Sequence, residues 1–121
     1  MPLRILVVDD SVVTRSLIQE FAEGLGHAVV GEAATLGEAV AAYQSQKPDL
    51  VTLDLSLADG DGIAVLKTLR GLDPQARVLV VSGNVQQAVH DEVRMAGAAG
   101  FLSKPFTLED LKRALARFTQ G

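Results

Sequence analysis

Five polar residues stand where short apolar runs of the sequence end, and their types suit phosphoryl chemistry. They are three carboxylates, one hydroxyl and one ammonium: Asp9, Asp10, Asp54, Ser82 and Lys104. Carboxylate oxygens are ligands for Mg²⁺, with Mn²⁺ as the alternative ion. A lysine and a hydroxyl can each contact a phosphoryl oxygen, and a carboxylate such as Asp54 can act as the nucleophile that forms an acyl phosphate. The set therefore predicts a metal-dependent site for phosphoryl transfer.

The charges of this set also favour a divalent cation. Three carboxylates held close together repel one another at neutral pH, so they need a proton or a cation between them. One lysine and one Mg²⁺ together cancel the charge of the three aspartates. Conversion of Asp54 to an aspartyl phosphate would then add only about one negative charge to the site.

Five short apolar runs are the predicted strands that position these residues, and they span residues 3–8, 28–32, 50–53, 78–81 and 100–103. The first and fourth runs contain Ile-Leu-Val-Val and Val-Leu-Val-Val, with no alternation of apolar and polar residues. This pattern indicates strands that are buried on both faces, as in a parallel sheet covered by helices.

Five further segments have the apolar spacing of amphipathic helices, with stripes at residues 13–25, 36–43, 65–69, 89–96 and 108–118. Thr35 and Glu38 match a capping box, and Ser11 and Thr107 are expected to cap helices as well. Helix ends are predicted at three glycines: Gly26, Gly71 and Gly97.

The strict alternation of strand and helix predicts the fold class. It indicates an α/β protein with a doubly wound, five-stranded parallel sheet between two layers of helices. No linker, repeat or low-complexity tract interrupts the pattern, so we expect one domain over residues 1–121. Sites in such sheets form beyond the carboxyl ends of the strands. Four of the five predicted strands end at the polar residues named above, which places all of them at this edge.

Composition excludes several other functions. The chain has no cysteine, so thiol catalysis and zinc–cysteine sites are excluded. Its net charge of −4 argues against direct nucleic-acid binding. No apolar run approaches the roughly 20 residues of a membrane span, and the N-terminus does not have the pattern of a signal peptide. We therefore expect a cytoplasmic protein with no membrane partner.

The ordered motifs resemble the receiver domains of bacterial response regulators, and the resemblance covers the whole chain. The segment 97–106, Gly-Ala-Ala-Gly-Phe-Leu-Ser-Lys-Pro-Phe, is especially typical of that family. The implied fold is the five-stranded, flavodoxin-like receiver fold. The residues that carry the resemblance follow the first, third, fourth and fifth predicted strands: Asp9, Asp10, Asp54, Ser82, Lys104 and Pro105.

The resemblance implies a role for each residue of the site. Asp54 would take a phosphoryl group from a histidine kinase or a histidine phosphotransfer protein. Asp10, Asp54 and the backbone carbonyl of Ser56 would bind Mg²⁺, and Asp9 would act through a bound water. Lys104 would pair with the phosphoryl group.

The resemblance also implies a switch. Ser82 would hydrogen-bond the phosphoryl group and draw Phe101 inward, which would reshape the face made by the fourth helix, fifth strand and fifth helix. A downstream protein would dock on that face. The bond between Lys104 and Pro105 would be cis. The protein would be a signalling phosphoacceptor, a monomer or a phosphorylation-dependent dimer, and it would catalyse only its own phosphorylation and dephosphorylation.

Several positions depart from the usual family pattern. Ser56 replaces a frequent asparagine, Ser82 a commoner threonine and Phe101 a common tyrosine. Leu57 and Ala58 stand where Met-Pro is frequent. The remaining expectations concern single residues: Asn84 beside the phosphate site, Asp59 and Asp61 as turn-formers rather than metal ligands, and His27 and His90 as surface residues.

Three other functions compete with this one. A phosphohydrolase of the haloacid dehalogenase type would need an aspartate at position 56 and a large cap segment. A flavodoxin-like nucleotide binder would need a phosphate-binding loop after the first strand, where Asp9 and Asp10 would repel phosphate. The nearer alternative is an interaction module that works without phosphorylation. We expect no output domain in this chain, and a stand-alone receiver and a piece of a longer regulator are both compatible with the sequence.

Overall fold

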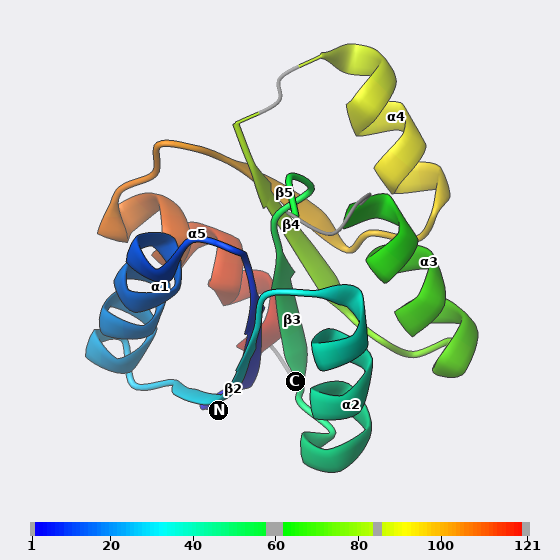
Figure 1. Ribbon diagram of the computed structural model, residues 1–121. Helices are drawn as coiled ribbons and strands as arrows, with labels where there is room; N and C mark the ends of the chain where they lie inside the picture. Colours follow the sequence, from blue (N-terminus) through cyan, green and yellow to red (C-terminus); the bar gives the residue numbers. More distant parts are fainter. Residues whose placement is uncertain (1, 58–61, 84–85, 120–121) are drawn as a thin grey trace.

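Five parallel strands form one sheet in the order β2-β1-β3-β4-β5 (Figure 1). The computed structural model describes residues 2–57, 62–83 and 86–119. The strands lie close to the predicted runs, and this fold confirms the predicted class. Their bounds are β1 Arg4–Val8, β2 Ala28–Ala33, β3 Leu50–Leu53, β4 Val78–Ser82 and β5 Gly100–Ser103.

Five helices cover the two faces of the sheet. Their bounds are α1 Val12–Gly24, α2 Leu36–Gln46, α3 Gly62–Leu72, α4 Gln87–Met95 and α5 Leu108–Thr119. Helices α1 and α5 lie on one face, and α2, α3 and α4 lie on the other (Figure 1). Among the described residues, no helix is long and apolar enough to cross a membrane.

The uninterrupted apolar runs are explained by these two layers. Ile5 and Val7 of β1 pack in the cluster with α1 and α5, whereas Leu6 and Val8 pack in the cluster on the opposite face. Successive side chains of a strand point to opposite faces, so both sets are buried. All four are at most 1% exposed. Burial of each such side chain contributes roughly 1.5–3 kcal/mol, which holds the strands that carry the site in place.

The predicted helix starts are confirmed by hydrogen bonds at their caps. Ser11 Oγ accepts from Thr14 N at 3.3 Å, and Thr35 Oγ1 accepts from Glu38 N at 3.2 Å. Thr107 Oγ1 likewise accepts from the backbone N–H of the residue three positions later, at 3.1 Å. The first turns of α1, α2 and α5 are therefore fixed by side-chain oxygens, as the sequence pattern indicates.

Two of the three glycine helix ends are confirmed and one is wrong. Gly26 and Gly97 have φ values of 91° and 100°, a left-handed conformation that suits glycine after a helix. Gly71 instead lies inside α3, which ends at Leu72. The helical hydrogen bonding continues past it, because Asp73 N donates to Leu69 O at 2.9 Å.

Candidate functional site

The neighbouring strands β1 and β3 bring Asp9 and Asp54 to the same edge of the sheet. Val8 and Leu53, which end the two strands, are partners in the ladder. Asp54 N donates to Val8 O at 2.9 Å, and Asp9 N donates to Ala33 O of β2 at 2.9 Å. The two aspartates therefore follow paired strand ends, and their predicted position beyond the sheet is confirmed.

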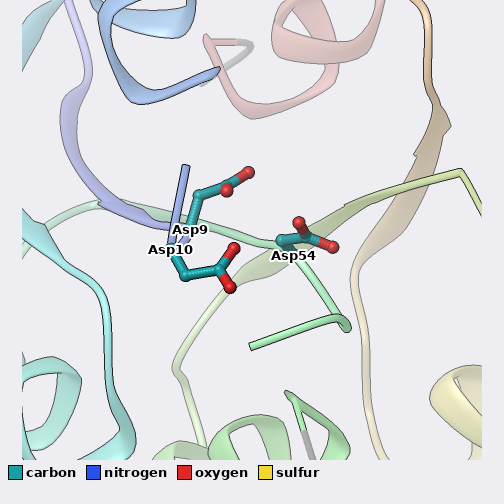
Figure 2. Close-up of side chains that lie close together, drawn as sticks. All are labelled: Asp9, Asp10 and Asp54. Atoms are coloured by element: carbon teal, nitrogen blue, oxygen red, sulfur yellow. The ribbon is translucent and has the colours of Figure 1, made fainter. Parts of the chain in front are cut away.

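Three carboxylates converge at this edge. Asp9, Asp10 and Asp54 each offer one oxygen within 4.8 Å of the others, and the three side chains lie close together (Figure 2). Asp9 and Asp54 are 1% and 7% exposed, whereas Asp10 is exposed. Three oxygen ligands with one side open to water suit Mg²⁺, which retains several waters when it binds a protein. The donor set therefore fits the predicted ion.

Lys104 joins two of these carboxylates. Its Nζ donates to Asp9 Oδ2 at 3.0 Å and to Asp54 Oδ2 at 2.9 Å. The bond from Lys104 to Pro105 is cis, as the resemblance implies. One ammonium among three carboxylates leaves a formal charge of −2, which is the charge that one divalent cation would neutralise.

Burial changes the protonation of this cluster. Burial raises the pKa of the Asp9 carboxyl above its ordinary value, and the hydrogen bonds from Ser11 N–H and Lys104 only partly oppose the shift. Burial alone would lower the pKa of Lys104, but its hydrogen bonds to Asp54 and Asp9 outweigh burial and raise that pKa. The lysine therefore stays charged, whereas the Asp9 anion is held at an energetic cost.

Ser56 and Ser82 lie beside the cluster in different environments. Ser56 is exposed, and its backbone N–H donates to Asp54 Oδ1 at 3.0 Å. Ser82 is fully buried at the end of β4, and its carbonyl accepts from Lys104 N at 3.0 Å. Both serines are thus tied to the segments that carry the phosphoacceptor candidate and the lysine.

Phe101 lies on β5 three residues before Lys104 and is half-buried. Its ring stacks on the imidazole of His90, with ring centroids 3.8 Å apart and an interplanar angle of 27°. The expectation that His90 is a surface residue is therefore wrong, since the ring is half-buried and its Nε2 is enclosed. The signal in the sequence was its place next to Val89, at the border of the apolar stripe of α4.

His27 was also expected at the surface, and it is half-buried instead. Its Nδ1 accepts a hydrogen bond from Leu3 N at 2.9 Å, at the end of the sheet opposite the acidic cluster. Burial lowers the pKa of the His27 imidazole. This contact joins the start of β1 to the loop before β2, which no local sequence pattern indicates.

Arg15 is a residue near the acidic cluster that the sequence patterns did not single out. Its Nη1 donates to the backbone carbonyl of Asp9 at 2.6 Å, and its Nε donates to Glu32 Oε1 at 3.0 Å. The Arg15 side chain is 17% exposed. A positive charge thus lies against the backbone of the acidic pair.

Four residues with sequence-based expectations lie outside the described residues: Ala58, Asp59, Asp61 and Asn84. Leu57, which takes the first place of the frequent Met-Pro, is buried and belongs to the core cluster that packs under α2 and α3.

Comparison with known proteins places these features in one family. The family model described as the response regulator receiver domain matches residues 5–116. The chain is 36% identical over 120 residues to the chemotaxis protein CheY of Thermotoga maritima, covering 99% of this chain and 100% of that protein. It is 37% identical over 115 residues to CheY of Bacillus subtilis, covering 95% and 96%.

A solved structure has the same fold. It is the complex of CheX with CheY, beryllium fluoride and magnesium from Borrelia burgdorferi. The match has a TM-score of 0.92 and 30% sequence identity, and it covers 99% of this chain and 92% of that one. The matched region therefore includes every strand that ends at the acidic cluster.

Proposed function

The chain belongs to the family of response regulator receiver domains, and on that premise we propose that Asp54 accepts a phosphoryl group in a Mg²⁺-dependent reaction. The observation that carries the proposal is the setting of the Asp54 carboxylate. It is 7% exposed, bonded to Lys104, and within 4.8 Å of two further carboxylates. In the family context, this arrangement supports a phosphoacceptor in a two-component or phosphorelay system.

The reaction follows from the chemistry of a carboxylate nucleophile. An Asp54 oxygen forms a bond to the phosphorus of a phosphohistidine, the bond from phosphorus to the histidine nitrogen breaks, and that nitrogen takes a proton from water. Lys104 exchanges a carboxylate partner for a phosphoryl oxygen, and the Ser82 hydroxyl donates to another. Asp10, Asp54 and the Ser56 carbonyl would bind Mg²⁺ or Mn²⁺, with Asp9 reached through water; the ion supplies positive charge where the phosphoryl group carries negative charge.

The output of this reaction would be a change of surface. In this proposal, Ser82 moves toward the phosphoryl group and Phe101 turns inward, which alters the face of α4, β5 and α5 for a downstream protein. Phe101 is half-buried and is the β5 partner of Val80, two residues before Ser82, so the two switch residues lie on adjacent strands.

The remaining parts of the proposal concern organisation and partners. Residues 1–121 act as one receiver, which receives its phosphoryl group from a histidine kinase or histidine phosphotransfer protein. It catalyses only its own phosphorylation and dephosphorylation, as a monomer or a phosphorylation-dependent dimer. The cytoplasmic location stays a prediction from the sequence.

The test is phosphorylation by a small acyl-phosphate donor, followed by intact mass. The wild type should gain one phosphoryl adduct with Mg²⁺ and none without it, and Asp54→Asn should gain none. Asp49→Asn is a matched control, because Asp49 is a carboxylate at the opposite edge of the sheet, and it should behave as the wild type. An adduct of equal yield on Asp54→Asn would contradict the assignment. If the wild type takes neither phosphate nor beryllium fluoride, the chain is an interaction module that works without phosphorylation.

A further inference from the structure

We propose that Arg15 is a positioning residue that holds the acidic cluster in the geometry needed to bind a divalent cation. The inference rests on the proposed function, in which Asp10 and Asp54 bind Mg²⁺. Arg15 does not touch these carboxylates; it acts through the backbone of Asp9 and through Glu32.

The guanidinium of Arg15 joins three separate elements. The Arg15 backbone is fixed in the first turn of α1, since its N–H donates to Ser11 O at 3.0 Å. Its side chain reaches the end of β1 at the Asp9 carbonyl, 2.6 Å away, and reaches β2 at Glu32, 3.0 Å away. Planar geometry with several donors suits arginine for such a bridge, and a lysine cannot reproduce it.

Arg15 fixes the peptide group from which Asp10 begins. The Asp9 carbonyl belongs to the same planar unit as the N–H of Asp10, so a bond that holds this carbonyl also sets the direction in which Asp10 leaves β1. The preceding peptide is held as well, by the bond from Asp9 N to Ala33 O. Asp10 is exposed, so its carboxylate depends on this backbone for its direction toward Asp54.

The Asp9 side chain is part of the same arrangement. Its Oδ1 accepts from Ser11 N at 2.8 Å, and its Oδ2 accepts from Lys104. Both carboxylate oxygens of Asp9 and both of its adjacent peptide groups are therefore hydrogen-bonded, so Asp9 is held in place. Among these bonds, the one from Arg15 to the Asp9 carbonyl connects Asp9 to α1 and, through Glu32, to β2.

Removal of Arg15 should change the affinity for Mg²⁺ in opposite directions, depending on whether its charge or its orienting role dominates. A positive charge near a cation site repels the cation, so its loss by itself would strengthen Mg²⁺ binding. Loss of a residue that orients the ligands weakens metal binding, typically by 10- to 100-fold for groups just outside the ligand shell. The sign of the change therefore distinguishes the two roles.

The experiment is a calorimetric titration of the full chain with Mg²⁺. Arg15→Gln should raise the dissociation constant about tenfold. Arg15→Lys, which retains the charge, should change it in the same direction, and Glu32→Gln should cause a smaller rise. Arg113→Gln is the matched control, because Arg113 also pairs with an acidic residue, Asp110, but at an exposed position on α5, and it should bind as the wild type does.

A second measurement separates positioning from a general loss of structure. The rate of phosphorylation by a small acyl-phosphate donor should reach the wild-type maximum at saturating Mg²⁺, with half-saturation shifted to higher Mg²⁺ in proportion to the calorimetric change. If Arg15→Gln fails to fold in EDTA, Arg15→Lys, which retains the charge, gives the result. Wild-type or tighter binding by the folded Arg15 variants would overturn this inference alone. Absence of Mg²⁺ binding by the wild type would overturn the proposed function with it.

Discussion

Charged residues are arranged differently at the two ends of the strands. At the amino ends of the strands, called here the amino edge, Asp49 is exposed, and its carboxylate accepts from Arg4 N at 2.8 Å. Arg77 Nε donates to the Asp49 carbonyl at 3.1 Å. At the carboxyl edge, by contrast, three carboxylates crowd within 4.8 Å, and two of them are buried around a single lysine.

The difference shows where the fold serves stability and where it serves chemistry. Dispersed and exposed charges cost little and gain little, because water screens them. Buried like charges cost free energy unless a cation joins them, and this cost is what makes a ligand bind there. At the amino edge the charged groups are hydrogen-bonded and exposed, whereas the carboxyl edge has an excess negative charge that a divalent cation can neutralise.

The largest expected effect is the stabilisation of the carboxyl edge by Mg²⁺. At about one hundred times its dissociation constant, Mg²⁺ should raise the free energy of unfolding by about 2.7 kcal/mol. Asp10→Ala should remove most of this gain without loss of the fold, since Asp10 is exposed. Urea unfolding with and without Mg²⁺ measures both. An equal gain in wild type and Asp10→Ala would contradict a cation site at Asp10.

Removal of the lysine should unbalance the carboxyl edge further. Lys104→Met leaves Asp9 and Asp54 without their shared cation, and the free energy of unfolding in EDTA should fall by about 2 kcal/mol, less than for a fully buried pair because Lys104 is 24% exposed on its side chain. Mg²⁺ should restore part of the loss.

The control for this substitution is Arg113→Met, at an exposed pair with Asp110. The expected loss there is below about 0.5 kcal/mol. Equal losses for Lys104→Met and Arg113→Met in chemical unfolding would remove the distinction between crowded and dispersed charges.

One buried polar group, the Thr52 hydroxyl, lies in the middle of the sheet, away from both ends of the strands. Thr52 of β3 is 1% exposed, and its Oγ1 has no hydrogen-bond partner among the described residues. Thr52→Val should therefore raise the free energy of unfolding by about 1 kcal/mol, because it removes an unsatisfied buried hydroxyl. A thermal melt of the two proteins is sufficient; a lower midpoint for Thr52→Val would mean that the hydroxyl is satisfied.

The smallest effect concerns pH at the amino edge. Burial lowers the pKa of His27, whose Nδ1 must be unprotonated to accept from Leu3 N. A lowered histidine pKa contributes stability above the ordinary pKa of about 6.5, and this contribution is lost as pH falls below that value. His27→Gln removes the titration, so between about pH 7 and about pH 5 the wild type should lose more stability than the variant. Parallel pH profiles would contradict the lowered pKa.

The fold could be predicted from the sequence because its signals are local. Runs such as Leu3 to Val8 and the caps at Thr35 and Thr107 depend on neighbouring residues, so each strand lies within one or two residues of its expected place. The acidic cluster could be predicted for a related reason. Once the strands are parallel, the residues after Val8 and Leu53 must meet at one edge.

The contacts that could not be predicted join residues through the tertiary fold. Arg15 meets Glu32 across 17 positions, and His27 meets Leu3 across 24. The stack of His90 on Phe101 depends on the rotation of α4 against β5. Spacing along the chain carries no information about such pairs, because they depend on how a helix is placed over a strand.

Phosphorylation at Asp54 is tested most directly by locating the phosphoryl group in the chain. After phosphorylation with a small acyl-phosphate donor and Mg²⁺, borohydride reduction converts an aspartyl phosphate to homoserine, and peptide mass spectrometry identifies its position. We expect homoserine at position 54 and unchanged aspartate at positions 9 and 10. Homoserine at either of those two positions, or a phosphate that survives reduction on Ser56 or Ser82, would contradict it.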